Sequence, residues 1–115
     1  MQGIITKLTA KDDKYACAIR NRVLYILAAN AQWDNENRFD AIISDYLSHI
    51  TDEKPITARQ CIKALAQVGV AKPQYIPRIL LCLHEADLSK YKDSMRPLIE
   101  KDIVETETIL TTSNP

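Results

Sequence analysis

The residues best able to bind a metal or to act as nucleophiles are three cysteines and two histidines. Cys17, Cys61 and Cys82 lie far apart in the sequence, whereas iron–sulfur and zinc ligands usually occur in close groups such as Cys-x-x-Cys. His49 and His84 come at the ends of expected helices, where an imidazole can contact exposed carbonyl groups. We therefore interpret the cysteines as small apolar core residues and the histidines as capping or surface residues. This interpretation predicts no metal and no cofactor.

The sequence also lacks the motifs that are typical of catalysis. It has no glycine-rich phosphate loop, no nucleophile elbow and no pair of carboxylates in a recognisable catalytic frame. A zinc pair would require two histidines four residues apart on one helix, or histidines grouped with cysteines or carboxylates. We therefore predict that the protein is not an enzyme and has no catalytic residues.

The charge balance bears on the class of partner. The 115 residues include 15 basic and 15 acidic side chains, so the formal net charge is zero. Nucleic-acid-binding proteins usually carry a net basic surface, so nucleic acid is not the expected partner. Six basic side chains could still line one groove, although we favour a solvated face with ion pairs between repeats. These six are Arg20, Arg22, Arg59, Lys63, Arg78 and Arg96.

The cysteine count and the apolar runs predict a cytoplasmic protein. A disulfide framework in a secreted chain would favour an even number of cysteines, and this chain has three. No apolar run approaches the roughly 20 residues that cross a bilayer. The first eight residues are too interrupted for a secretory signal. We expect no membrane partner.

The elements that position these residues follow a pattern that occurs twice. An apolar helical stripe, a short polar turn and a second apolar stripe run from Arg20 to Leu47 and again from Arg59 to Leu83. A helix pair repeated at about 40 residues is typical of an α-solenoid. In this alignment Val23, Ile26 and Ala29 correspond to Ile62, Leu65 and Val68, and Phe39, Ile42, Ile43 and Tyr46 correspond to Ile76, Ile79, Leu80 and Leu83.

We therefore expect an all-α fold, an α-α superhelix with two helix pairs and a closing C-terminal helix. The units cover about residues 14–50 and 57–84, and the closing helix covers about 94–110. Together they make a single repeat domain over residues 1–110. Residues 111–115 are expected to form a disordered tail.

Local signals predict the boundaries of the third helix. Thr57 and Gln60 form a capping box that would begin it, and Gly69 would end it. We expect Arg59 to bond to a neighbouring helix end or to the loop near residues 52 and 53.

Two aromatic residues, Trp33 and Tyr91, fall in loops at the boundaries of the units. Aromatic residues in such places can be anchors in protein interfaces or plugs between repeats. We favour plugs.

Two stretches of the chain resemble a known family. Ile56-Thr-Ala-Arg-Gln-Cys-Ile-Lys-Ala-Leu and Asp87-Leu-Ser-Lys-Tyr-Lys-Asp-Ser-Met-Arg-Pro-Leu-Ile are similar to small bacterial HEAT-like repeat proteins of unassigned function. Some of these carry a label borrowed from iron–sulfur cluster assembly. The resemblance covers about residues 16–103 and implies the fold. It also implies further helices before the Arg20 region, so a helix face left open here would accept a partner or form a homodimer through uncapped solenoid ends.

The function that follows is a non-enzymatic scaffold for a protein or peptide. In HEAT-like stacks the second helix of each pair usually lines the concave face. The alternative is a nucleic-acid-binding module related to HEAT-like DNA-repair solenoids, which use basic concave surfaces. The partner-binding residues expected on the second helices are Asp40, Ser44, Ser48, Gln74, Arg78, Leu81 and Glu85.

Overall fold

The computed structural model describes residues 16–35 and 37–113. Over these residues the chain forms five α-helices and four short 3₁₀ helices, and no strand. The α-helices are α2 (Ala16–Asn30), α3 (Ile43–Ser48), α4 (Pro55–Ala71), α5 (Ile76–His84) and α6 (Arg96–Ser113). The 3₁₀ helices are Ala31–Trp33, Arg38–Ala41, His49–Thr51 and Pro73–Tyr75. The expected all-α class is confirmed.

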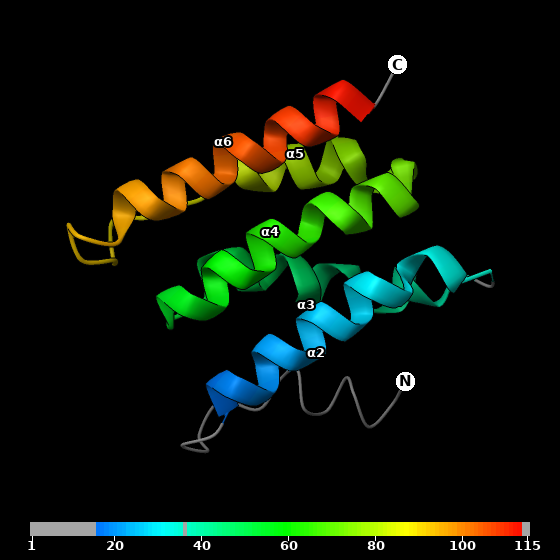
Figure 1. The fold of residues 1–115 in the computed structure, drawn as a ribbon, viewed down its shortest axis with the longest axis horizontal. Helices are drawn as coiled ribbons and strands as arrows, with labels where there is room; N and C mark the ends of the chain where they lie inside the picture. Colours follow the sequence, from blue (N-terminus) through cyan, green and yellow to red (C-terminus); the bar gives the residue numbers. More distant parts are fainter. Residues whose placement is uncertain (1–15, 36, 114–115) are drawn as a thin grey trace.

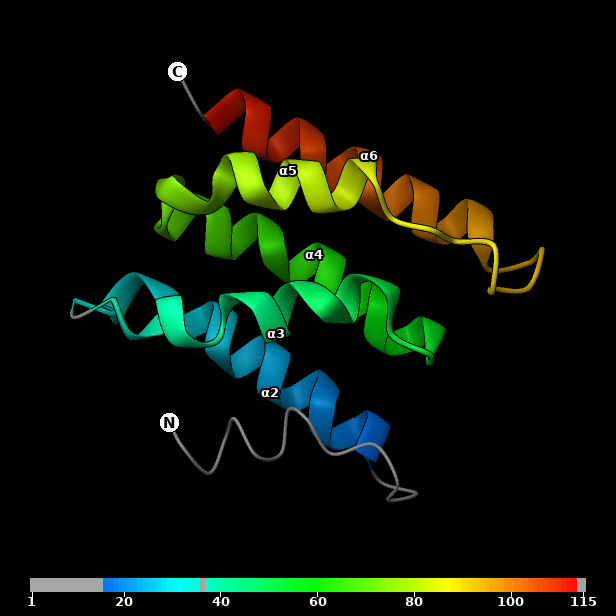
Figure 2. The same ribbon diagram turned by 180° about the vertical axis from the view of Figure 1, so that it is seen from behind.

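The helices form two layers (Figures 1 and 2). α2, α4 and α6 lie side by side in one layer and run in the same direction, while α3 and α5 return in the second layer. The molecule measures 39 × 34 × 18 Å, and its smallest dimension fits two helices packed about 8–10 Å apart. α4 lies between α2 and α6. None of the helices in the described residues is both long and apolar enough to cross a bilayer.

α4 is buried on several sides because it contacts helices of both layers. Its small residues, such as Ala58, Ala64 and Gly69, allow the neighbouring helices to approach closely. Larger apolar side chains fill the space between the layers. The buried residues of α4 are Thr57, Ala58, Cys61, Ile62, Ala64, Leu65, Val68 and Gly69.

The correspondence between the second helices of the two units agrees with the observed burial. Seven of the eight matched side chains are buried and Leu80 is half-buried. The Phe39 ring contacts both Tyr46 and Tyr75, with centroid distances of 5.5 Å and 6.1 Å, and so joins the units inside this layer. The correspondence between the first helices fails at Ile26, which is 43% exposed. Among the described helices α2 packs mainly against α4, and α3 reaches it through the Tyr46 hydroxyl, which donates to the Leu24 carbonyl at 2.7 Å. Fewer positions of α2 than of α4 are therefore covered.

The expected second helix is broken into three pieces. A 3₁₀ helix, Arg38–Ala41, precedes α3, and another, His49–Thr51, follows it. Asp34 imposes the first of these, because its carboxylate accepts the amides of Arg38 and Phe39 at 2.8 Å and 2.7 Å. Side chains that satisfy free amides in this way commonly set the start of a helical segment.

The predicted start of the third helix and the predicted start of the C-terminal tail were wrong. α4 begins at Pro55, two residues before Thr57, because proline suits the first turn of a helix. The predicted capping box therefore lies inside the helix. α6 continues to Ser113, so residues 111–113 are helical rather than a disordered tail. The predicted unit start at residue 14 and the last two residues lie outside the described part of the chain.

Lys72 joins the end of α4 to the turn after α2. Its ammonium donates to the Asp34 carbonyl at 2.6 Å and to Asn37 Oδ1 at 3.0 Å, and it lies 3.5 Å from the Asp34 carboxylate. Asn37 adopts a left-handed conformation with φ of 56°, which asparagine tolerates better than most residues. Burial would raise the pKa of Asp34, but the two amides and Lys72 outweigh it and lower the pKa.

Gly69 does not end α4, which continues to Ala71. It marks a close approach instead, because a Cβ atom at this position would lie 2.3 Å from Leu110 Cδ2 on α6. Leu110 is fully buried, so it has little room to move. The absence of a side chain at Gly69 thus sets the distance between α4 and α6.

We predict that Gly69→Leu lowers the free energy of unfolding by about 1–3 kcal/mol, the usual cost of overpacking a core. Urea denaturation followed by circular dichroism would measure the loss. Gln67→Leu, at an exposed position on the same helix, is the matched control and should change stability by less than about 0.5 kcal/mol. Equal stability of the two variants would contradict the proposed close approach.

Candidate interaction surface

The seven residues expected to bind a partner all lie at the surface of the layer that contains α3 and α5. Three come from the first unit, on or just before α3, and four come from the second unit, on α5 or next to its ends. Leu81, the apolar member, is 55% exposed. The exposed set is Asp40, Ser44, Ser48, Gln74, Arg78, Leu81 and Glu85.

Two hydrogen bonds connect this surface across the boundary between the units. The Arg78 guanidinium donates to Ser44 Oγ, and the Tyr75 hydroxyl donates to the Asp40 carboxylate. Burial and the acceptor Asp40 raise the pKa of Tyr75, so its hydroxyl remains a donor. The structure therefore brings Asp40, Ser44 and Arg78 together.

A groove of about 510 Å³ opens at one end of this surface, beyond α3 and α5. Leu47 and Ile50 from the first unit and Cys82 and Ala86 from the second form its apolar lining. Of the seven predicted residues, Glu85, which directly follows the end of α5, lines this groove, and Ser48 lines the pocket next to it. The polar lining residues are Thr51, Glu85, Asp87 and Lys90.

A smaller polar pocket of about 190 Å³ continues the groove toward α2. The two spaces share Thr51 and Lys90, and the Lys90 ammonium donates to the Thr51 carbonyl. We call the two spaces together the α3–α5 groove. The small pocket is lined by Arg20, Ser48, His49, Thr51, Asp52, Glu53 and Lys90.

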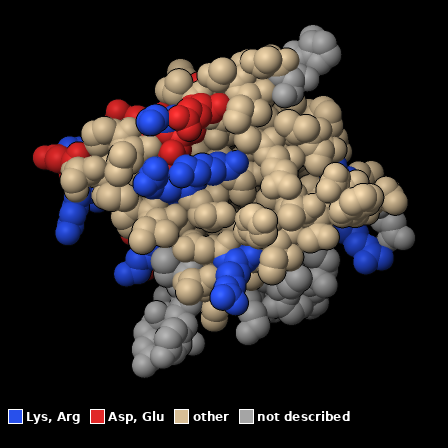
Figure 3. Space-filling model, in the orientation of Figure 1, with Lys and Arg blue, Asp and Glu red and all other residues tan. Residues whose placement is uncertain are grey.

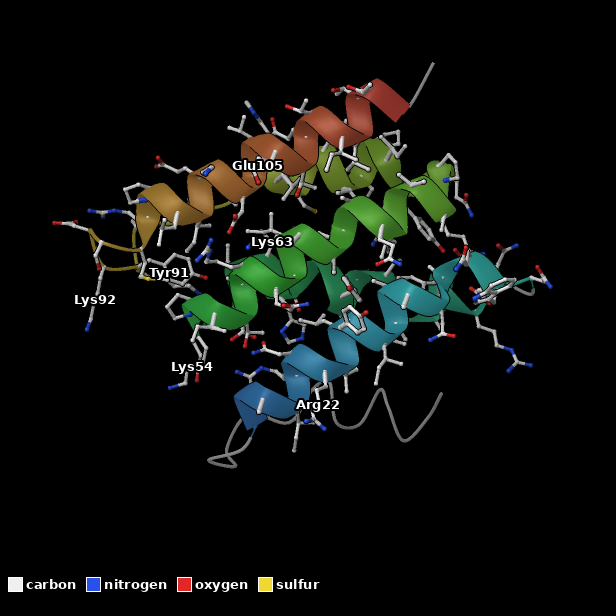
Figure 4. The ribbon with its side chains drawn as sticks, viewed as in Figure 1. Arg22, Lys54, Lys63, Tyr91, Lys92 and Glu105 are labelled. Atoms are coloured by element: carbon white, nitrogen blue, oxygen red, sulfur yellow. The ribbon has the colours of Figure 1, made fainter. Side chains whose placement is uncertain are left out.

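Asp52, which lies under the small pocket, is the centre of a buried polar cluster. Its carboxylate accepts two hydrogen bonds from Arg20, both at 3.1 Å, and the Lys54 amide at 2.9 Å. His49 Nδ1 lies 2.7 Å from Asp52 Oδ2. The Tyr91 hydroxyl donates to the Asp52 carbonyl, and Figure 4 shows Tyr91 reaching from the loop before α6 toward the start of α4. One residue thus links α2, α4 and the last loop.

These contacts determine the charge of Asp52. Burial would raise its pKa, but hydrogen bonds from His49, the Lys54 amide and Arg20 outweigh burial and lower the pKa to about 2. The carboxylate is therefore ionised at neutral pH and can only accept hydrogen bonds. His49 Nδ1 must then be the donor of the hydrogen bond to the Asp52 carboxylate. Among the described residues nothing bonds to Nε2, and His49 lines the small pocket.

Several other predictions about single residues were wrong. His49 is buried and bound to Asp52 rather than capping at the surface, whereas His84 is exposed at the end of α5. Arg59 does not contact the loop near residue 52. Its guanidinium donates to Asp102 of α6 at 2.6 Å, because Arg20 already occupies Asp52.

The two loop aromatics differ from each other. Tyr91 is 5% exposed and fills the space between units, as predicted for a plug. Trp33 is 70% exposed and does not act as a plug.

The cysteines with described side chains are free thiols. Cys61 is fully buried, donates to the Tyr46 carbonyl at 3.3 Å, and has a raised pKa because of that burial.

The six basic residues considered for a nucleic-acid groove do not share one surface. Arg20 and Arg59 are bonded to Asp52 and Asp102, respectively, and Arg96 lies against Asp93. Arg22 and Lys63 belong to the α2–α4–α6 layer and Arg78 to the other layer. Glu105 of α6 contributes the opposite charge to that layer, and the space-filling view of it shows both signs with a wide uncharged area (Figures 3 and 4). These positions do not favour a basic concave face.

Two observations bear on the chemistry of the α3–α5 groove. In the part of the chain that the structure describes, no three side chains are grouped as metal ligands. The hydroxyl of Ser48, next to His49, donates to the Asp45 carbonyl, so it is not aligned as a nucleophile on the imidazole.

Comparison with protein-family models, with curated proteins and with solved structures finds no match for this chain. The site must therefore be interpreted from its own geometry.

Of the residues that line the α3–α5 groove, sequence reasoning identified Ser48 and Glu85 as contacts and missed the others, among them Thr51, His49, Asp87 and Lys90. All four lie at or beyond helix ends, where apolar periodicity gives no information. The available signal was the cluster of charged residues that follows each second helix, Asp52-Glu53-Lys54 and Glu85-Ala-Asp87.

We predict that Asp52→Ala lowers the free energy of unfolding by about 3–5 kcal/mol, because it removes the carboxylate that accepts two hydrogen bonds from the buried Arg20. Urea denaturation would measure the loss. Asp45→Ala removes an exposed carboxylate from α3 and should cost less than about 0.5 kcal/mol. A loss below about 1 kcal/mol at Asp52 would contradict a structural role for the cluster.

The lowered pKa of Asp52 predicts that the free energy of unfolding decreases in acid. Its pKa falls from 3.8 to about 2 on folding, so the folded state binds this proton less readily. The contribution of the ionised Asp52 to the free energy of unfolding is complete above about pH 4 and is lost as the pH falls toward 2. The loss amounts to about 2 kcal/mol.

Urea denaturation of the wild type and of Asp52→Asn at several pH values would measure this difference. The gap in stability between the two proteins should narrow by about 2 kcal/mol on going from pH 5 to pH 2. A gap independent of pH would contradict the lowered pKa.

Proposed function

We propose that this protein is a non-enzymatic scaffold that binds a protein or peptide segment on the surface formed by α3 and α5. The observation that carries the proposal is the groove of about 510 Å³ at the boundary between two helix pairs. Its volume lies within the range of recognised ligand sites, about 300–1,000 Å³, and its lining combines apolar side chains with a few polar ones.

The surface beside the groove supports the same proposal. Arg78, Leu81 and Glu85 follow one another at helical spacing along α5. The apolar side chain of Leu81 is 55% exposed and lies between the charged residues Arg78 and Glu85. Exposed apolar residues with a polar rim are typical of protein interaction sites.

The proposal includes a HEAT-like architecture. The two described helix pairs and α6 place their first helices in one layer and their second helices in the other (Figure 1). This arrangement is what a short α-α superhelix would have, with α3 and α5 on its ligand-binding side. A cytoplasmic location fits the free thiols of Cys61 and Cys82.

We predict that Arg78→Glu combined with Leu81→Glu weakens partner binding by at least about tenfold, since both side chains lie on the proposed contact surface. The tagged protein would be used to isolate partners from its native cells, and mass spectrometry would compare the proteins retained by each variant. Both positions are exposed, so the fold should be preserved, which circular dichroism would check.

The control is the matched pair Leu98→Glu and Lys101→Glu on α6, where both residues are also exposed. It should retain the same partners as the wild type. If the Arg78 and Leu81 variant retained every partner, the assignment of this surface would be wrong.

A further inference from the structure

We propose that the α3–α5 groove recognises a cationic amphipathic segment of another protein: one apolar side chain seated in the groove and adjacent Lys or Arg side chains directed at Glu85 and Asp87. This inference rests on the proposed function, and it adds the chemistry of the partner. Three properties of the groove support it.

The first property is its apolar lining. Leu47 and Ile50 belong to the core and only their edges reach the groove, while Cys82 and Ala86 are half-buried. Together they form the apolar part of the lining, at the junction of the two units. An aliphatic side chain placed there would remove apolar surface from water at about 25 cal/mol per Å².

The second property is its charge. Three exposed carboxylates line the groove, on Glu53, Glu85 and Asp87, against one exposed ammonium, on Lys90. None of these carboxylates forms an ion pair within the described residues. Arg20 and Asp52, the remaining charges, neutralise each other. The groove therefore has an excess of negative charge, although the whole chain has none.

Asp87 is held in its charged form. The Ser89 amide donates to its carboxylate at 3.0 Å, and bonds from the Ser89 backbone and side chain lower its pKa. Its ionised state at neutral pH does not depend on a bound cation.

The third property is a shortage of donors. Lys90 is the exposed cation, and its ammonium is already engaged by the Thr51 carbonyl. The exposed carboxylates of Glu85 and Asp87, by contrast, can only accept hydrogen bonds. A partner that supplies N–H donors next to an apolar residue satisfies these carboxylates, and Lys and Arg side chains carry donors without acceptors.

A peptide-display selection tests the proposal without assuming a sequence. A random peptide library is selected on the wild-type protein, and the peptides are then measured against Glu85→Lys combined with Asp87→Lys by fluorescence anisotropy. The selected peptides that bind this surface should combine an apolar residue with net positive charge. Their affinity for the double variant should fall by at least about tenfold, as expected when two charge pairs become repulsive.

The matched control is Glu100→Lys combined with Glu107→Lys on α6, which changes the net charge of the protein by the same amount away from the groove. It should alter affinity by less than about twofold. A peptide with Lys and Arg replaced by Glu should bind the Glu85→Lys and Asp87→Lys variant better than the wild type, which a purely structural effect would not produce. Glu85→Gln combined with Asp87→Asn serves if the double lysine variant does not fold.

The outcomes separate this inference from the proposed function. Peptides that lose binding in the Arg78 and Leu81 variant but are neutral or acidic would overturn the inference and leave the scaffold function intact. The same holds if the groove binds a second copy of the chain, seen as a dimer by sedimentation that the double lysine variant abolishes. A selection in which no peptide depends on either surface would overturn both.

Discussion

The burial of one ionised carboxylate, Asp52, constrains the arrangement of much of this structure. A charge removed from water must be paired and hydrogen-bonded, or it destabilises the fold by several kcal/mol. Asp52 meets this condition with groups that lie far apart in the sequence: Arg20 on α2 and the Lys54 amide at the start of α4. Its own carbonyl accepts Tyr91 from the last loop. Any displacement of these segments would leave the charge without partners.

Two further polar contacts act in the same way at other boundaries. Lys72 holds the end of α4 to the turn after α2 through Asp34, and Arg59 holds α4 to Asp102 of α6. Between these contacts the packing is apolar and less directional. Apolar contacts supply most of the stability, while the polar contacts define which position along each helix faces its neighbour. Both cations belong to α4 or to the residue that follows it, which is consistent with the place of α4 between α2 and α6.

The same cluster that joins the helices also shapes the candidate binding surface. Thr51 and Lys90, which connect the two parts of the α3–α5 groove, are adjacent in sequence to Asp52 and Tyr91. Asp52 also orients His49, which lines the small pocket. Buried charges are thus paired within the protein, whereas the carboxylates of Glu85 and Asp87 on the outside are left to solvent or to a partner. Because of this separation, a change of charge at Glu85 or Asp87 leaves the buried ion pairs in place.

The sequence by itself determined the helical class, the order of the elements and most of the core. The apolar spacing identified Phe39, Ile42 and Tyr46 as counterparts of Ile76, Ile79 and Leu83, because this periodicity is a local property that survives in the folded protein. It also placed all seven proposed contact residues on the exposed side. The partners of polar side chains were decided only by the tertiary structure. Arg20 and Arg59 occupy similar sequence contexts but bind Asp52 and Asp102, and Tyr91 is buried while Trp33 is exposed. Such choices depend on which segments meet in space, and a sequence pattern with a period of a few residues contains no information about those distances.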